Sequence, residues 1–195
     1  DFKLFLEKEI RLALKSQDFI LYYQPQLEQS SSTISAEALI RWSHPSKGMQ
    51  APVEFIAIAE ECGLVIPLGN WVIDEACRQT KAWNDAGQRL DKIAVNVSPK
   101  QFRHTDFVDS VRRSIEKNNI KARQLMLEVT EGVVIGDIED TIEKMHILKS
   151  IGVRISVDDF GTGYSSLMYL KKLPLNQLKI DQSFIRDIID DPSDA

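Results

Sequence analysis

Cysteine is scarce in this sequence, which contains only Cys62 and Cys77 among its 195 residues. The two thiols form neither a Cys-x-x-Cys metal motif nor the framework of a disulfide-stabilised scaffold. We therefore expect both to be buried thiols in a protein of a reducing compartment. This favours a cytoplasmic location, either for a whole protein or for the cytoplasmic part of a membrane-anchored one.

Long hydrophobic runs and an excess of basic residues are also missing. No run approaches the roughly 20 apolar residues of a membrane-spanning helix, and the N-terminus lacks the charged and then apolar layout of a signal peptide. We expect no membrane contact by this domain. The net charge of −5 argues against binding of long nucleic acids, whose phosphates need a basic face. A small anionic ligand held through metal ions is compatible with this charge.

The hydrophobic residues, 43% of the chain, are numerous enough for one substantial core, and their spacing predicts an α/β fold. A helical period extends over residues 2–19, residues 20–42 read as a β-hairpin, and residues 52–87 read as two helices broken between Gly63 and Pro67. Farther along, strands are predicted at residues 92–98, 124–131, 153–160 and 177–184. Helices are predicted between them, at residues 106–119, 138–152 and 165–173. This order is typical of a parallel sheet with helical crossovers.

Polar side chains recur near the ends of the predicted strands, about one strand–helix unit apart. Most lie on the face opposite the apolar row of their strand. In a barrel of parallel strands the C-terminal ends share one rim, and active sites form at that rim. We therefore expect five side chains to converge there: Glu37, Asn96, Glu128, Asp158 and Asp159.

Carboxylates gathered in one pocket repel each other and raise one another's pKa values unless cations neutralise them. An all-oxygen set favours Mg²⁺, Mn²⁺ or Ca²⁺ over zinc, and the three histidines have no ligand spacing. The adjacent Asp158 and Asp159 suit a site with two ions about 3.5–4 Å apart, as in phosphodiester chemistry. Lys179 and Arg41 offer positive charge for phosphate oxygens.

Taken singly, each of these residues also has a structural explanation. Acidic residues followed by Gly161 are ordinary turn composition. Asn96 suits a strand end, Glu128 and Glu131 suit a surface pair, and Lys179 suits a solvated position. Only the joint occurrence of these residues favours a site.

Five ordered motifs resemble those of the EAL domain family. They are "EALIRW" at residues 37–42, "NVS" at 96–98, "LEVTE" at 127–131, "DDFGTGYSSL" at 158–167 and "KIDQSF" at 179–184. That family contains bacterial phosphodiesterases that linearise cyclic di-GMP to 5′-pGpG. The resemblance covers essentially the whole chain. It implies a modified TIM (β/α)8 barrel with one antiparallel strand, of which about six of the eight strands are present.

The resemblance also implies roles for residues at the matching positions. Two divalent ions, Mg²⁺ or Mn²⁺, would be held by Glu37, Asn96, Glu128, Asp158 and Asp159. Lys179 would hold the attacking water, and Asp159 would bind the second ion or its water. Glu131 would hold the loop at residues 158–167 in place. Gln24, Leu39 and Arg41 would contact the substrate.

The resemblance further implies a homodimer that is fused to sensory or GGDEF-type domains in the parent protein. Family sequences continue for roughly 50–60 residues, about two βα units, past the point where this chain stops. We therefore expect residues 1–195 to be an EAL-type phosphodiesterase domain truncated at its C-terminus. We also expect a chain that ends at Ala195 to be inactive or weakly active. A non-catalytic cyclic di-GMP receptor and a pure dimerisation scaffold are the alternatives.

Overall fold

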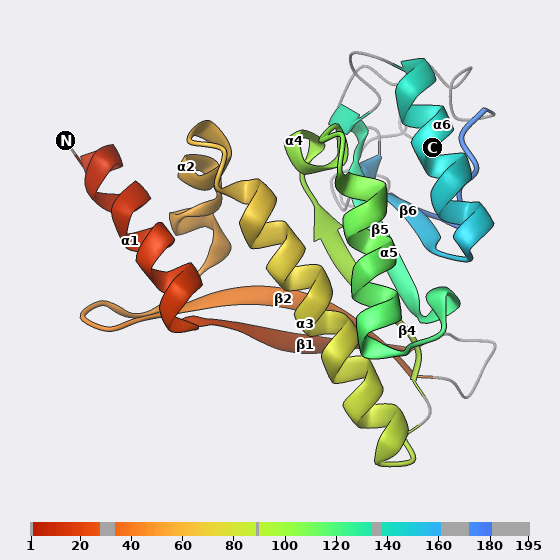
Figure 1. The fold of residues 1–195 in the computed structure, drawn as a ribbon, viewed down its shortest axis with the longest axis horizontal. Coiled ribbons are helices and arrows are strands. Elements are labelled where there is room, and N and C mark those ends of the chain that lie inside the picture. The colour runs from red at the N-terminus through yellow and green to blue at the C-terminus, as the bar shows by residue number, and fades with distance from the viewer. Residues whose placement is uncertain (1, 28–33, 89, 134–137, 161–171, 181–195) are drawn as a thin grey trace, which may run out of the picture.

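The structure is a computed structural model, and it describes residues 2–27, 34–88, 90–133, 138–160 and 172–180 (Figure 1). These residues form a mixed α/β fold built on one sheet. Among them, no helix combines the length and the apolar character needed to cross a lipid bilayer.

Six strands of the sheet follow one another in chain order, as in a barrel. They are β1 (Phe19–Leu27), β2 (Ile34–His44), β4 (Leu90–Val97), β5 (Leu125–Thr130), β6 (Arg154–Phe160) and β7 (Gln177–Ile180). β1 is antiparallel to β2, and all later neighbours in this order are parallel. The predicted parallel sheet and its antiparallel first strand are therefore confirmed. The short β3 (Gly48–Gln50), which pairs with the C-terminal end of β2, was not predicted.

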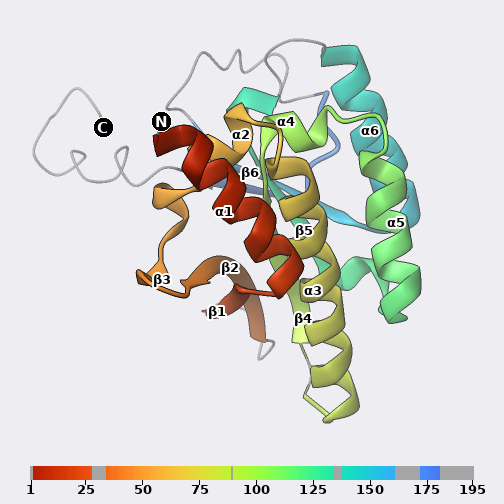
Figure 2. The same cartoon turned by 60° about the vertical axis from the view of Figure 1, so that its left-hand side comes forward.

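Helices cover one face of this sheet. Figure 2 shows α3, α5 and α6 side by side along it, and α1 stands beside the β1–β2 hairpin. The bounds are α1 (Phe2–Ser16), α2 (Ile56–Glu61), α3 (Val65–Asp85), α4 (Pro99–Phe102), α5 (Phe107–Asn118) and α6 (Ile138–Ile151). The described residues also form three 3₁₀ turns: η1 (Pro52–Glu54), η2 (Ala122–Gln124) and η3 (Glu131–Val133). The predicted break between two helices is confirmed. Pro67 lies in the first turn of α3, where the missing N–H does no harm.

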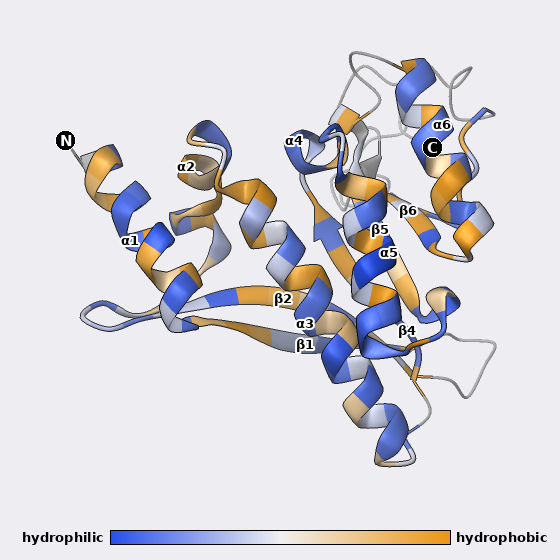
Figure 3. Cartoon of the chain, in the orientation of Figure 1, coloured by the Kyte–Doolittle hydropathy of each residue, from blue (hydrophilic) through white to orange (hydrophobic). Residues whose placement is uncertain are grey.

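Two hydrophobic clusters hold the layers together. The larger one joins the helix-facing side of the sheet to α3, α5 and α6, with Ile93, Phe102 and Leu127 fully buried. The smaller one packs α1 and α2 around Trp42 and Phe55. Figure 3 shows that α3 and α5 also carry many hydrophilic residues, as expected for helices that bury only one side. The barrel interior on the other face of the sheet is left for polar side chains.

Some local predictions differ from the structure or lie outside its described residues. Cys77 is buried, but Cys62 is only partly buried, because it ends α2 near the surface. The four-residue α4 is too short to produce a hydrophobic period. The hairpin turn, most of the helix predicted at residues 165–173 and the second half of the last strand lie outside the described residues.

An ion pair links β4 to β6 at the end of the barrel opposite the rim. Arg154 places Nη1 2.6 Å and Nη2 3.3 Å from the two carboxylate oxygens of Asp91. These hydrogen bonds, with the charge of Arg154, hold the pKa of Asp91 below its ordinary value of 3.8. A carboxyl whose pKa is lower in the folded protein than in the unfolded chain stabilises the fold above its ordinary pKa. This contribution is lost as the pH falls through the lower pKa of the folded protein.

We therefore expect Asp91→Asn to lower the free energy of unfolding at pH 7 by about 1 kcal/mol, the scale of a partly exposed ion pair. The difference from the native protein should shrink as the pH falls below 3.8 and through the lower pKa that Asp91 has in the folded protein. Urea unfolding at pH 7 and pH 3 measures both values. Asp85→Asn, which breaks the exposed Lys81–Asp85 pair on α3, is the control and should change little. An Asp91→Asn deficit of equal size at both pH values would contradict this assignment.

Candidate active site

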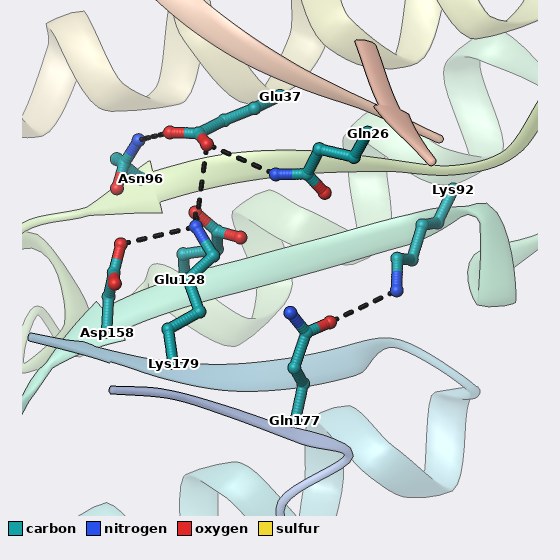
Figure 4. Close-up of polar contacts among 8 residues, drawn as sticks. All are labelled: Gln26, Glu37, Lys92, Asn96, Glu128, Asp158, Gln177 and Lys179. Carbon is teal, nitrogen blue, oxygen red and sulfur yellow. Dashed lines mark hydrogen bonds and ion pairs between the residues drawn. The ribbon is translucent and has the colours of Figure 1, made fainter. Parts of the chain in front are cut away.

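Four of the five polar residues predicted to converge lie on the interior face of the sheet, near the C-terminal ends of the parallel strands (Figure 4). Strand register places Asn96 beside Glu128 and Glu128 beside Ser156. Neighbours at one level of a parallel sheet point to the same side. The side chains of Glu37, Asn96, Glu128 and Asp158 therefore come from four successive strands to one region.

Lys179 on β7 reaches into the middle of this group. Its ammonium nitrogen lies 2.5 Å from Oε2 of Glu128, 3.3 Å from Oδ2 of Asp158 and 3.4 Å from Oε2 of Glu37. One cation thus neutralises carboxylates from three separate strands. The sequence predicted that divalent metal ions relieve this repulsion, and in this structure the ammonium group of Lys179 lies among the carboxylates.

Amide side chains surround the carboxylate of Glu37. Nδ2 of Asn96 donates to Oε1 at 2.9 Å, and Nε2 of Gln26 donates to Oε2 at 3.2 Å. Gln24 lies directly opposite Glu37 in the β1–β2 register, so its side chain emerges on the same face. Both oxygens of Glu37 are therefore oriented toward the group.

Burial raises the pKa of Glu128. Its side chain is fully buried, and loss of hydration raises its pKa despite the opposing hydrogen bond and charge of Lys179. Burial lowers the pKa of Lys179, but the hydrogen bond that its ammonium donates to Glu128 and the surrounding negative charges outweigh burial and raise it. Oε1 of Glu128 and Oγ of Ser156 have no hydrogen-bond partner among the described residues. Glu128 thus keeps one oxygen available to a further partner.

The substrate-contact candidates line the rim beside this group. Leu39 and Arg41 follow Glu37 on the interior face of β2, and Gln24 lies opposite Glu37 on β1. The Arg41 guanidinium carbon lies 5.7 Å from the ring centroid of the half-exposed Tyr22, which is opposite Leu39. Sequence reasoning missed both Tyr22 and Gln26. The two-residue period of β1 alongside Gln24 was the signal that would have found them.

Two predicted residues cannot be placed at the level of their side chains. Asp159 belongs to β6 and Glu131 begins η3, but both side chains lie outside the described part of the structure. Most of the "DDFGTGYSSL" segment also lies outside it. The backbone position of Asp159 follows directly after Asp158 on the strand that supplies the group.

In the part of the chain that the structure describes, no three carboxylate, imidazole or thiolate groups lie close enough together to enclose a metal ion. The ammonium of Lys179 lies among three of the carboxylates. An oxygen set gathered around one cation has the ligand chemistry of a site for hard divalent ions.

A cavity of about 500 Å³ adjoins the group. The pairing of β2 with β4 ends at Ala38 and Val95, although both strands continue beyond these residues. The cavity lies where the two strands separate, between the rim and the starts of α3 and α4. Its walls are mainly apolar, with the polar residues Asn96 and Glu128 at one end. A largely apolar cavity with a few placed polar groups is typical of a small-molecule site.

The sequence matches the family described as "EAL domain" over residues 7–195. It is 44% identical, over 99% of its length, to the bifunctional diguanylate cyclase/cyclic di-GMP phosphodiesterase MucR of Pseudomonas aeruginosa. It is 42% identical, over 95% of its length, to the cyclic di-GMP phosphodiesterase NbdA of the same organism. The chain spans 28% and 24% of the lengths of these two curated relatives.

A solved structure of high similarity is described as the PaMucR phosphodiesterase in complex with c-di-GMP. It superposes with a TM-score of 0.88 at 44% sequence identity, and the match covers 97% of this chain and 77% of that chain.

Proposed function

This chain belongs to the EAL domain family, and we propose that it hydrolyses cyclic di-GMP to linear 5′-pGpG with the help of divalent metal ions. The observation that supports this most directly is the set of three carboxylates, Glu37, Glu128 and Asp158, grouped around one cation at the strand ends. The names of the relatives supply the substrate, and the neighbouring cavity has the size of a small-molecule site.

The donor set fits Mg²⁺ or Mn²⁺. All candidate ligands offer oxygen, and the buried Glu128 has an oxygen without a partner among the described residues. We propose that one ion is held by Glu37, Asn96, Glu128 and Asp158 and that Asp159 serves the second ion. Bound ions would stabilise the charge that develops on the attacking and leaving oxygens of the phosphodiester.

The protein's own groups would orient the reactants. Lys179 would donate hydrogen bonds to the water that attacks phosphorus, because its ammonium is fixed among carboxylates at the rim. Arg41 would bind a phosphate oxygen, and Leu39 and Gln24 would contact the rest of the dinucleotide. Formation of a 5′-phosphate requires that the bond from phosphorus to the ribose O3′ breaks, with the proton of the water passing to O3′. Glu131 would keep the loop at residues 158–167 in position.

We also propose the wider setting of the domain. As in other members of the family, it would act in the cytoplasm as part of a homodimer, fused to sensory or GGDEF-type domains. The short coverage of its relatives is compatible with such a fusion. Size measurement of the full-length protein by light scattering tests the dimer, and a monomer at micromolar concentration would contradict it.

The proposed activity is tested by incubating the full-length protein with cyclic di-GMP and Mg²⁺ or Mn²⁺, and separating the products by chromatography. We expect linear 5′-pGpG to accumulate, and we expect EDTA to stop its formation. Residues 1–195 alone should be inactive or much slower. Tight binding of cyclic di-GMP without turnover at saturating metal would instead identify a non-catalytic receptor.

A further inference from the structure

The position of one wall of the cavity beside Glu37, Glu128 and Asp158 depends on a single glycine. Gly69 on α3 faces Gln101 on α4, and both residues line the cavity. A Cβ atom at Gly69 would lie 2.2 Å from Oε1 and 2.4 Å from Nε2 of Gln101. Contacts this short are not tolerated, so any side chain at Gly69 must displace the amide.

Gln101 has little freedom in other directions. It is 2% exposed, and its backbone N–H donates to Oγ of Ser98 at 3.1 Å, which fixes the start of α4. Its neighbour Phe102 is fully buried in the main core. The backbone of Gln101 is therefore held, and only the end of its side chain can move.

The nitrogen of this amide is positioned by packing. Nε2 of Gln101 has no hydrogen-bond partner among the described residues. Its position therefore depends on the space above Gly69, and the open volume next to it is the cavity. If that space were filled, the displaced amide would have to enter the cavity.

We propose that Gly69 and Gln101 together set the width of the substrate cavity. The absence of a side chain at Gly69 leaves room for the Gln101 amide, and the position of that amide determines how tightly the substrate binds. This inference rests on the proposed function, because it takes the cavity as part of the site for the cyclic dinucleotide. The groups proposed for chemistry lie outside this contact. Narrowing the cavity should therefore weaken binding equally in the ground state and the transition state.

We expect Gly69→Ala to raise KM for cyclic di-GMP about tenfold and to leave kcat within a factor of two, since one methyl must be accommodated in packed surroundings. The same change should appear as a tenfold weaker affinity in calorimetry with cyclic di-GMP and EDTA, where no turnover is expected. Gly132→Ala is a matched control on the same rim. Its Cβ would meet its nearest neighbours at 3.7 Å, an ordinary contact.

A second substitution separates the cavity effect from a general loss of packing. Gly69→Ala combined with Gln101→Ala removes the displaced amide, so affinity should return to within threefold of the native protein. If Gly69→Ala does not fold, the double variant Gly69→Ala/Gln101→Asn takes its place. Its shorter amide leaves room for the methyl, and it should also bind within threefold of native.

The possible results distinguish this inference from the proposed function. A native protein that does not bind cyclic di-GMP would refute the proposed function. Native binding with unchanged affinity in Gly69→Ala would refute only the role of Gly69 and Gln101. A tenfold loss that persists in the folded double variants would also refute it, because the amide would then not be the cause.

Discussion

Replacement of Glu128 by glutamine is expected to abolish metal-dependent hydrolysis of cyclic di-GMP, with a fall in kcat of roughly a thousandfold or more. Glu128 is fully buried, it is the carboxylate nearest to Lys179 at 2.5 Å, and its second oxygen has no partner among the described residues. An amide of the same size keeps the packing but removes the negative charge that would hold a divalent ion. The affinity for Mn²⁺ should therefore fall together with the rate.

Turnover by chromatography and Mn²⁺ affinity by electron paramagnetic resonance measure the two effects. Glu143→Gln, on the exposed side of α6, is the matched control and should alter neither. The same loss of rate with native Mn²⁺ affinity would remove Glu128 from the proposed ligand set. Native activity in the Glu128→Gln protein would contradict the proposed site as a whole.

Replacement of Lys179 by methionine is expected to lower the rate of hydrolysis without lowering the affinity for Mn²⁺, whereas Glu128→Gln lowers both. The ammonium competes with added cations for Glu128, Asp158 and Glu37, which lie 2.5–3.4 Å from it. Without it, the carboxylates lose their internal counter-charge, so affinity for Mn²⁺ should rise or stay unchanged. The rate should nevertheless fall roughly a thousandfold, because the attacking water loses its hydrogen-bond donor.

Lys92→Met provides the matched control for this experiment. Lys92 is also buried on the interior face, but at the opposite end of the strands, where its ammonium bonds to Oε1 of Gln177 at 3.1 Å (Figure 4). Its loss should lower stability and leave Mn²⁺ affinity and turnover near native values. If Lys179→Met lost Mn²⁺ affinity while remaining folded, the proposal that Lys179 and the metal compete for the carboxylates would be refuted.

The architecture could be predicted from sequence because its elements are long and regularly patterned. The hairpin strands, the broken pair of helices and the strand–helix units between residues 90 and 160 each have a clear hydrophobic period, and the described residues contain them within a few positions. The short elements β3, α4 and η1 to η3 could not be predicted. They are too short to show a period and exist because their neighbours pack around them.

The candidate site was predictable for a different reason. Strand-end positions and the two-residue alternation place Glu37, Asn96, Glu128 and Asp158 on one face before any distance is known. Gln26 was missed although the two-residue period of β1 places it on the same face as Gln24. The contact of Gly69 with Gln101 joins α3 to α4, and only tertiary packing brings those residues together. The central position of Lys179 among three carboxylates likewise depends on side-chain conformation.

The reversed direction of β1 has a mechanical consequence. In a barrel with only parallel strands, the chain enters the first strand at the end far from the reaction centre. Here Phe19, the first residue of β1, pairs with Trp42, and the N–H of Ser43 donates to the carbonyl of Asp18 at 2.8 Å. The junction between α1 and β1 therefore lies next to Arg41. A displacement of α1 would therefore act on the C-terminal end of β2, through the Asp18–Ser43 hydrogen bond and the packing of α1 against Trp42, at the end of the barrel that carries Arg41.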